Sequence, residues 1–129
     1  MNEVRDRPAR FLRLKQRADF RRAAKGAKAH QPPFTLQSFR RPDSEQPGVA
    51  RAGFTVTKKV GCAVVRNRIR RRLKEAIKRA APDAERPGRD YVVIARETAL
   101  HAEFSALVQA FDRAFAELER ARPRPHQKR

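Results

Sequence analysis

Cysteine is nearly absent from this 129-residue sequence, and its scarcity excludes two common ways of stabilising a small protein. Cys62 is the only cysteine, so the chain forms no internal disulfide. A structural zinc site needs several Cys or His ligands, and His30, His101 and His126 are scattered without ligand spacing. The sequence therefore predicts a protein that binds no metal or other cofactor of its own.

Long hydrophobic runs are also missing. No apolar stretch approaches the roughly 20 residues of a membrane-spanning helix. The first ten residues, MNEVRDRPAR, lack the apolar segment of a secretory signal. We therefore expect a cytoplasmic protein with no membrane partner. A hydrophobic fraction of 40% over this length can support the modest core of one domain.

Acidic residues are few compared with basic ones. The chain contains 14 Asp and Glu against 32 Lys and Arg, which gives a formal net charge of +18. Such an excess of one sign repels itself in the compact state, so a polyanion is the natural partner. Nucleic acid is the first candidate. An anionic membrane surface is the second on charge alone, and we do not expect it as a partner.

Proline, glycine and hydrophobic periodicity divide the chain into short elements. We expect a flexible basic arm over 1–12, one domain over 13–120 and a disordered basic tail over 121–129. Helices are predicted over 19–25, 65–81 and 102–120, and strands over 34–39, 51–57 and 91–94. This order predicts a mixed α/β (α+β) sandwich, in which a single sheet packs against three helices.

The predicted helix over 65–81 is the strongest functional feature. At about 100° per residue, Ile69, Leu73 and Ile77 fall on one narrow face, and arginine and lysine cover the rest. Glu75 is the only acid between positions 58 and 79. Like charges one turn apart destabilise a helix, which favours a compensating anion. Arginine also grips phosphate with two hydrogen bonds, so the helix predicts nucleic-acid binding.

Near the predicted start of this helix, the side-chain amide of Asn67 is compatible with two roles. It could cap the helix by accepting a free backbone N–H, or it could hydrogen-bond to RNA. The sequence leaves both hypotheses open.

The same segment resembles a known signature. The run RNRIRRRLKE, preceded by GFTVTKKVGCAVV, resembles the RNR motif of bacterial ribonuclease P proteins. In that family two lysines, a hydrophobic residue and a glycine precede a short spacer and Arg-Asn-Arg at the start of a basic helix. Upstream RLKQRADF and downstream DYVVIARETA are similar to other parts of the family pattern. The resemblance runs from about position 13 to about 118.

The resemblance implies a fold and a division of labour. It implies a mixed sheet of about four strands, one more than the hydrophobic pattern predicts, with a left-handed βαβ crossover that holds the basic helix. It also implies an endoribonuclease in which the catalytic RNA subunit performs the chemistry with magnesium. The protein would supply no catalytic residue, and would bind that RNA and the 5′ leader of precursor tRNA. No protein partner is implied.

Specific residues follow from the resemblance. Those expected to contact the RNA subunit are Lys58, Lys59, Arg66, Asn67, Arg68, Arg70 and Arg71. Those expected to contact the leader are Phe20, Phe34 and Arg96, because aromatic faces stack on unpaired bases; Phe34 could equally be a core residue. At Ala24, Thr57 and Cys62 the chain departs from aromatic or lysine residues that some family members carry, so no leader contact is assigned there.

Three other functions fit parts of the sequence less well. A structural RNA-binding protein, such as a ribosomal protein, fits the composition but not the RNR motif. A DNA-binding module would need a helix-turn-helix partner, whereas strands and loops precede the basic helix. A self-sufficient nuclease would need an acid–base or metal constellation. We interpret Asp83, Glu85, Asp90 and Glu97 as surface carboxylates, because their spacing matches no nuclease motif.

Overall fold

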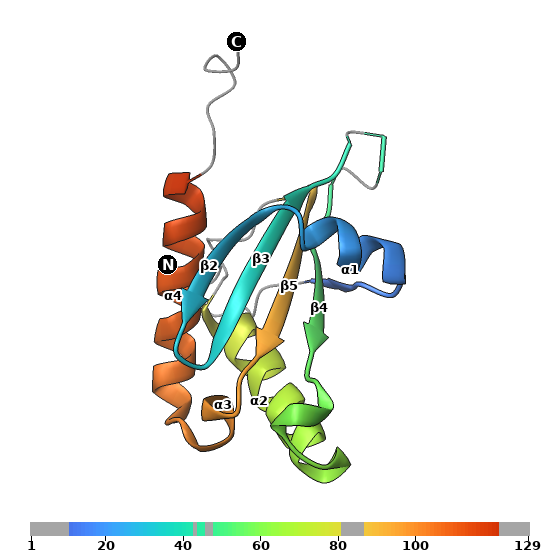
Figure 1. The fold of residues 1–129 in the computed structure, drawn as a ribbon. Helices are drawn as coiled ribbons and strands as arrows, with labels where there is room; N and C mark the ends of the chain where they lie inside the picture. Colours follow the sequence, from blue (N-terminus) through green and yellow to red (C-terminus); the bar gives the residue numbers. More distant parts are fainter. Residues whose placement is uncertain (1–10, 43, 46–47, 81–86, 122–129) are drawn as a thin grey trace.

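The computed structural model describes residues 11–42, 44–45, 48–80 and 87–121. They build one five-stranded sheet, with α2 and α4 on one face and the short α1 on the other (Figure 1). In chain order the elements are β1 (Leu12–Arg13), α1 (Arg17–Ala23), β2 (Ala27–Gln31), β3 (Phe34–Arg40), β4 (Arg51–Thr55), the 3-10 turn η2 (Lys58–Val60), α2 (Ala63–Ala80), β5 (Arg89–Ala95), α3 (Thr98–His101) and α4 (Phe104–Ala121). Residues 1–10 of the predicted arm and 122–129 of the predicted tail lie outside the described residues.

The sheet is mixed, as the sequence predicts. Its strand order is β1-β4-β5-β3-β2, in which β3 pairs antiparallel with β2 and β5, and β4 pairs parallel with β1 and β5. Helix α2 connects the parallel strands β4 and β5. In Figure 1 both strands run downward, β5 lies to the left of β4 and α2 lies behind the sheet, so this connection is left-handed. The resemblance implied this crossover against the general right-handed preference.

Strand β5 is the central strand that its continuous apolar run predicts. Tyr91 and Val93 point to the face that carries α2 and α4, while Val92 points to the face that carries α1. All three side chains are buried. The larger core lies between the sheet and the two long helices, where the ring of Tyr91 packs edge-on against Phe115 at 5.1 Å between centroids. A smaller core lies under α1.

The prediction of three strands from the hydrophobic pattern was wrong, because β1 and β2 are also present. Strand β2 has the polar sequence AKAHQ, and only Ala29 in it is buried. It lies at an edge of the sheet and pairs with β3 alone. An edge strand with one exposed face does not need a hydrophobic run, so pattern alone did not find it. Strand β1 covers only two residues and begins inside the segment that we predicted to be a flexible arm.

Candidate nucleic-acid interface

The basic residues of helix α2 lie on its solvent-facing side and on the two flanks next to it. Its buried side, formed by Ile69, Leu73 and Ile77, faces the core. Arg68 and Arg71 lie on the opposite side and are exposed. At about 100° per residue, the remaining bases lie on the two flanks between these sides. The one-sided helix predicted from the sequence is confirmed, and its first helical residue is Ala63 rather than Val65.

One arginine of this helix is occupied by the fold itself. Arg72 donates hydrogen bonds to the backbone oxygens of Ala99 at 2.6 Å, Leu100 at 3.1 Å and Ala102 at 2.5 Å. These oxygens lie at the end of α3, where helix carbonyls lack partners and attract a cation. Arg72 therefore ties α2 to the α3–α4 connection.

The Arg-Asn-Arg run is partly organised by local hydrogen bonds. Arg66 donates through Nε to the backbone oxygen of Gly61 at 3.0 Å, and Asn67 accepts through Oδ1 from Arg70 Nη1 at 2.9 Å. Because α2 begins at Ala63, Asn67 lies inside the helix, and the hypothesis that it caps the helix was wrong. Its amide instead orients the guanidinium of Arg70.

Two lysines and a cysteine lie beside the start of α2. Lys58 and Lys59 are exposed in the turn η2. This turn contacts α2, so the two lysines lie next to the basic helix, as their position in the RNR motif suggests. Cys62 is exposed, and backbone N–H groups of Val65 and Val64 lower the pKa of its thiol. In the described part of the chain, no group of three or more His, Cys, Asp or Glu could hold a metal ion.

The three predicted leader residues do not lie together. Phe34 is fully buried in the larger core, where its ring stacks on Phe111 at 4.2 Å between centroids. A ring in this position cannot stack on a base without leaving the core, so assigning Phe34 to the leader was wrong, and its alternative role as a core residue is confirmed. The other two residues, Phe20 and Arg96, belong to the opposite side of the sheet.

Phe20 extends from α1 over the edge of β4. A Cβ on Gly53 would lie 2.4 Å from Cζ of this ring and 3.1 Å from Cβ of Leu14, so a side chain at this position would displace the ring. Gly53 therefore allows the aromatic ring to lie directly on the strand. No pattern in the sequence pointed to this pairing, since the two residues are far apart in the chain.

Arg96 lies on the same face of the sheet as Phe20, near strands β3 and β2 rather than β4. Its Nη2 donates to Thr35 Oγ1 at 2.7 Å, and its Nη1 donates to the backbone oxygen of Gln31 at 2.5 Å. His30 Nδ1 lies 2.9 Å from the same Thr35 hydroxyl. Arg96 and His30 are exposed, and they form a polar group that the sequence analysis did not find. If β2 had been recognised, the alternation of side chains along β2 and β3 could have indicated that His30 and Thr35 are neighbours on one face of the sheet.

A buried ionic cluster fixes α1 on the sheet. Asp90 of β5 accepts hydrogen bonds from Arg41 at 2.6 Å and Arg51 at 2.8 Å, and Arg22 of α1 lies 3.6 Å away. Burial would raise the pKa of Asp90, but the hydrogen bonds and charges of Arg51 and Arg41 outweigh burial and lower it. Asp90 is completely buried, so interpreting it as a surface carboxylate was wrong. Asp83 and Glu85 lie outside the described residues.

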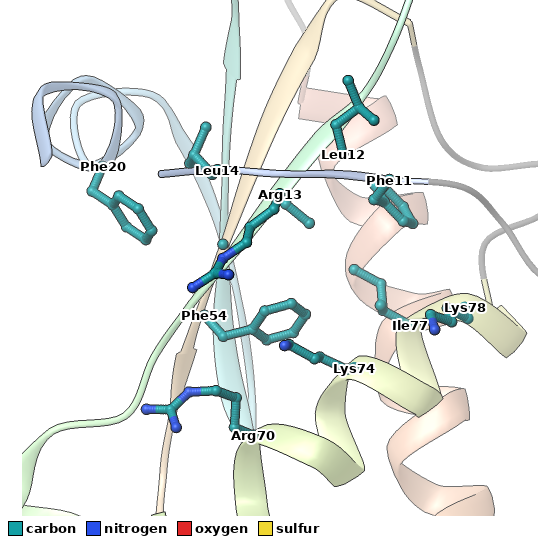
Figure 2. A pocket seen from close by; sticks show the side chains of 12 residues that line it. Phe11, Leu12, Arg13, Leu14, Phe20, Phe54, Arg70, Lys74, Ile77 and Lys78 are labelled. Carbon is teal, nitrogen blue, oxygen red and sulfur yellow. The ribbon is translucent and has the colours of Figure 1, made fainter. Parts of the chain in front are cut away.

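A hollow of about 320 Å³ opens where β1, β4 and α2 meet (Figure 2). Phe20 and Phe54 contribute aromatic rings to it, and Ile77 lies at its α2 side. Its basic residues are Arg13, Arg70, Lys74 and Lys78. This combination of aromatic surface and cations suits a partly apolar anion, such as a nucleotide.

Comparison with known proteins decides the family. The family model described as Ribonuclease P matches residues 9–119 of this chain. The chain belongs to the ribonuclease P protein family. Two relatives named Ribonuclease P protein component illustrate the similarity. The one from Brucella suis is 46% identical over 108 residues, covering 80% of this chain and 77% of the relative. The one from Bartonella quintana is 43% identical over 121 residues, covering 91% and 86%.

Solved structures of ribonuclease P proteins share the fold. The protein from Staphylococcus aureus superposes with a TM-score of 0.68 at 26% identity, covering 85% of this chain and 97% of that one. The protein from Thermotoga maritima has a TM-score of 0.64 at 24% identity, with coverage of 78% and 96%. The second similarity supports the fold alone.

Family membership gives this chain a general role. It is a protein subunit of ribonuclease P, an enzyme of tRNA processing, and it has an RNA partner in that ribonucleoprotein. None of the helices in the described ranges is long and apolar enough to cross a membrane.

Proposed function

We propose that this ribonuclease P subunit binds the catalytic RNA through α2 and η2 and binds the 5′ leader of precursor tRNA on the α1 side of its sheet. In this way it assists the endonucleolytic cut that generates the mature 5′ end of the tRNA. The observation that carries the proposal is the exposed basic side of α2. Arg68 and Arg71 project from it, and neither forms an ion pair within the described residues.

Phosphate is the ligand that best fits this basic side. Lys58 and Lys59 continue it beyond the start of the helix. Guanidinium groups bind phosphate oxygens with paired hydrogen bonds, and phosphate contacts dominate the affinity of proteins for nucleic acids. The RNA subunit would therefore lie along α2, with Arg66, Asn67 and Arg70 completing the contact.

The leader is assigned to the α1 side for different reasons. Phe20 at the β4 edge offers a ring on which an unpaired base can stack. Arg96, across the sheet, offers a guanidinium held by Thr35. Thr55 and Ile94 lie between them on this side and are partly exposed. A single strand crossing the sheet could contact both ends.

The chemistry is assigned to the RNA subunit, with magnesium as its metal. The described residues offer no cluster of metal ligands, and Cys62 has no neighbouring base among its hydrogen-bond partners. The protein residues would then bind and orient RNA rather than move protons in the reaction.

Reconstitution tests the proposed function directly. Protein, cognate catalytic RNA and precursor tRNA are mixed at low magnesium, and the released leader is measured. We expect rapid cleavage at the 5′ end only when both subunits are present, and no cleavage by the protein with magnesium alone. Robust cleavage by RNA-free protein, or no effect of the protein on the RNA, would refute the proposal.

A further inference from the structure

The hollow between β1, β4 and α2 contains more than an aromatic wall. Strand β1 pairs with β4 only as far as Arg13 opposite Ala52. The hydrogen bonds at this edge run from Leu12 N–H to Ala50 O at 2.9 Å and from Leu14 N–H to Ala52 O at 3.0 Å. The next part of β4 therefore has no strand partner on this side within the described residues.

This end of the pairing leaves backbone groups available in the hollow. Alternate residues of a strand in a parallel pair direct their backbone groups to the same edge. The N–H and C=O of Phe54 therefore point to the edge that Ala50 and Ala52 use, and no described backbone group bonds to them there. A donor and an acceptor next to an aromatic ring are what the edge and face of a nucleobase require.

The cations around the hollow suit the phosphates of such a nucleotide. Lys74 and Lys78 lie one turn apart on the flank of α2, with Arg70 a turn before them, and Arg13 faces them from β1 (Figure 2). Lys74, Lys78 and Arg13 are exposed. A volume of about 320 Å³ lies at the lower end of the ~300–1,000 Å³ range of ligand pockets.

We propose that this hollow binds one unpaired nucleotide of the RNA subunit, with its base against Phe54 and its phosphates on the flank of α2. The inference rests on the proposed function and adds a second kind of contact to it. The exposed side of α2 would bind phosphates, whereas the hollow would take a base out of the RNA. The backbone groups of Phe54 would bind a hydrogen-bonding edge of that base.

The RNA subunit is favoured over the leader as the source of this nucleotide. Three of the four cations around the hollow belong to α2, the helix assigned to the RNA subunit. Arg70 is also oriented by Asn67 of the RNR motif, to whose Oδ1 it donates a hydrogen bond. Of the two residues assigned to the leader, Arg96 follows β5 and binds residues of β2 and β3, on the far side of β5 from this edge. Phe20 lines the hollow from the α1 face, where it packs over Gly53, whereas the ring of Phe54 lies on the α2 face.

A photocrosslink identifies the occupant. Arg13 is replaced by p-benzoylphenylalanine in the full chain, and the protein is irradiated with the RNA subunit, first without and then with precursor tRNA. We expect a crosslink to one unpaired nucleotide of the RNA subunit that forms without precursor. A crosslink to the leader alone, to base-paired RNA alone, or to no RNA at all would overturn the inference.

Matched variants test how much the hollow contributes to the affinity for the RNA subunit. Phe54→Leu keeps an apolar side chain but removes the stacking face, so it should weaken binding to the RNA subunit about 5- to 150-fold, the equivalent of one base–aromatic stack of ~1–3 kcal/mol. Lys74→Ala with Lys78→Ala should also weaken binding, and more than Arg113→Ala with Arg120→Ala, which removes the same charge from exposed positions of α4. Equal effects of the two double variants would overturn the inference.

These outcomes separate the hollow from the proposed function. If the wild-type protein does not bind the RNA subunit, the proposed function fails. If it binds and the Phe54 and lysine variants bind as tightly as wild type, only the hollow is refuted. Thermal melting monitors folding, and should Phe54→Leu unfold, the crosslink and the lysine comparison decide.

Discussion

Asp90 lies fully buried among arginines and connects α1 to the sheet. Replacing it with Asn would remove the carboxylate that the buried guanidinium of Arg41 binds at 2.6 Å. Breaking a buried ion pair on one side costs ~3–5 kcal/mol. We therefore expect Asp90→Asn to lower the free energy of unfolding by about this amount in urea titrations at pH 7. Glu75→Gln is the matched control, because its pair with Arg79 is exposed and such pairs contribute little.

The same carboxylate predicts how stability depends on pH. The pKa of Asp90 is lowered from its ordinary value of 3.8, so its contribution is complete above that value and is lost as the pH falls through the folded-state pKa. Glu45 behaves alike, because its hydrogen bond with Arg22 lowers its pKa. Wild-type stability should fall below about pH 4, and Asp90→Asn should show a shallower fall. An unchanged pH profile in the variant would contradict this account.

Phe20 is the residue whose two roles can be separated by experiment. We expect Phe20→Ala to reduce the affinity of the assembled enzyme for precursor tRNA more than for mature tRNA. One lost stacking contact should cost ~1–3 kcal/mol. If the ring serves packing alone, the variant should instead lose up to ~3–5 kcal/mol of stability and discriminate the leader as well as wild type. Binding with and without a leader is therefore measured together with thermal melting.

At the scale of elements, α2 contains neighbouring arginines with opposite roles. Arg71 is exposed, whereas Arg72 bonds to three backbone oxygens at the end of α3. Arg71→Ala should weaken binding to the RNA subunit and reduce the slope of log affinity against log salt by about 0.7–0.9, with stability unchanged. Arg72→Ala should instead lower the free energy of unfolding by roughly 1.5–3 kcal/mol, the range for hydrogen bonds to charged groups.

Both variants remove one positive charge, so any difference between them in affinity or stability cannot come from the net charge of the protein. Salt-dependent binding and urea unfolding are measured for each. If Arg72→Ala is as stable as wild type, or if Arg71→Ala keeps the wild-type affinity and slope, the division of roles within α2 is wrong.

The elements also differ in how well sequence predicts them. The two long helices and β5 have strong periodicity or a continuous apolar run, so their positions were predicted to within a few residues. Strand β2 exists because its backbone pairs with β3, and only Ala29 is buried in it. A polar edge strand leaves little trace in hydrophobicity, so the partner strand determines it.

At the scale of the whole molecule, the two long helices differ in the sign of their charge. Helix α2 contains eight basic residues and one acidic residue, whereas α4, which packs beside it, contains two basic and three acidic residues. Of these two helices, α2 is therefore the one that attracts a polyanion, and α4 is not expected to contact the RNA.

This distribution predicts a lower demand for magnesium. Fixed cations along α2 would replace some of the diffuse counterions that crowded RNA phosphates require. Added wild-type protein should lower the magnesium concentration at which the catalytic RNA reaches half its maximal cleavage rate. Arg68→Ala with Arg71→Ala should shift that midpoint back toward the value for RNA alone. A magnesium titration that the protein leaves unchanged would contradict the proposed function.

The sequence by itself determined the mixed α/β class, the central strand, the long helices and the one-sided basic helix, because each depends on periodicity or composition along a continuous segment. It also provided the RNR motif that led to the family. Only the tertiary structure decided which charged and aromatic residues are available to a ligand. Phe34 is in the core, Asp90 is buried and Arg72 is bonded to α3, while Phe20 lies over Gly53 of a distant strand. These outcomes depend on which segments pack together, and local sequence patterns do not contain that information.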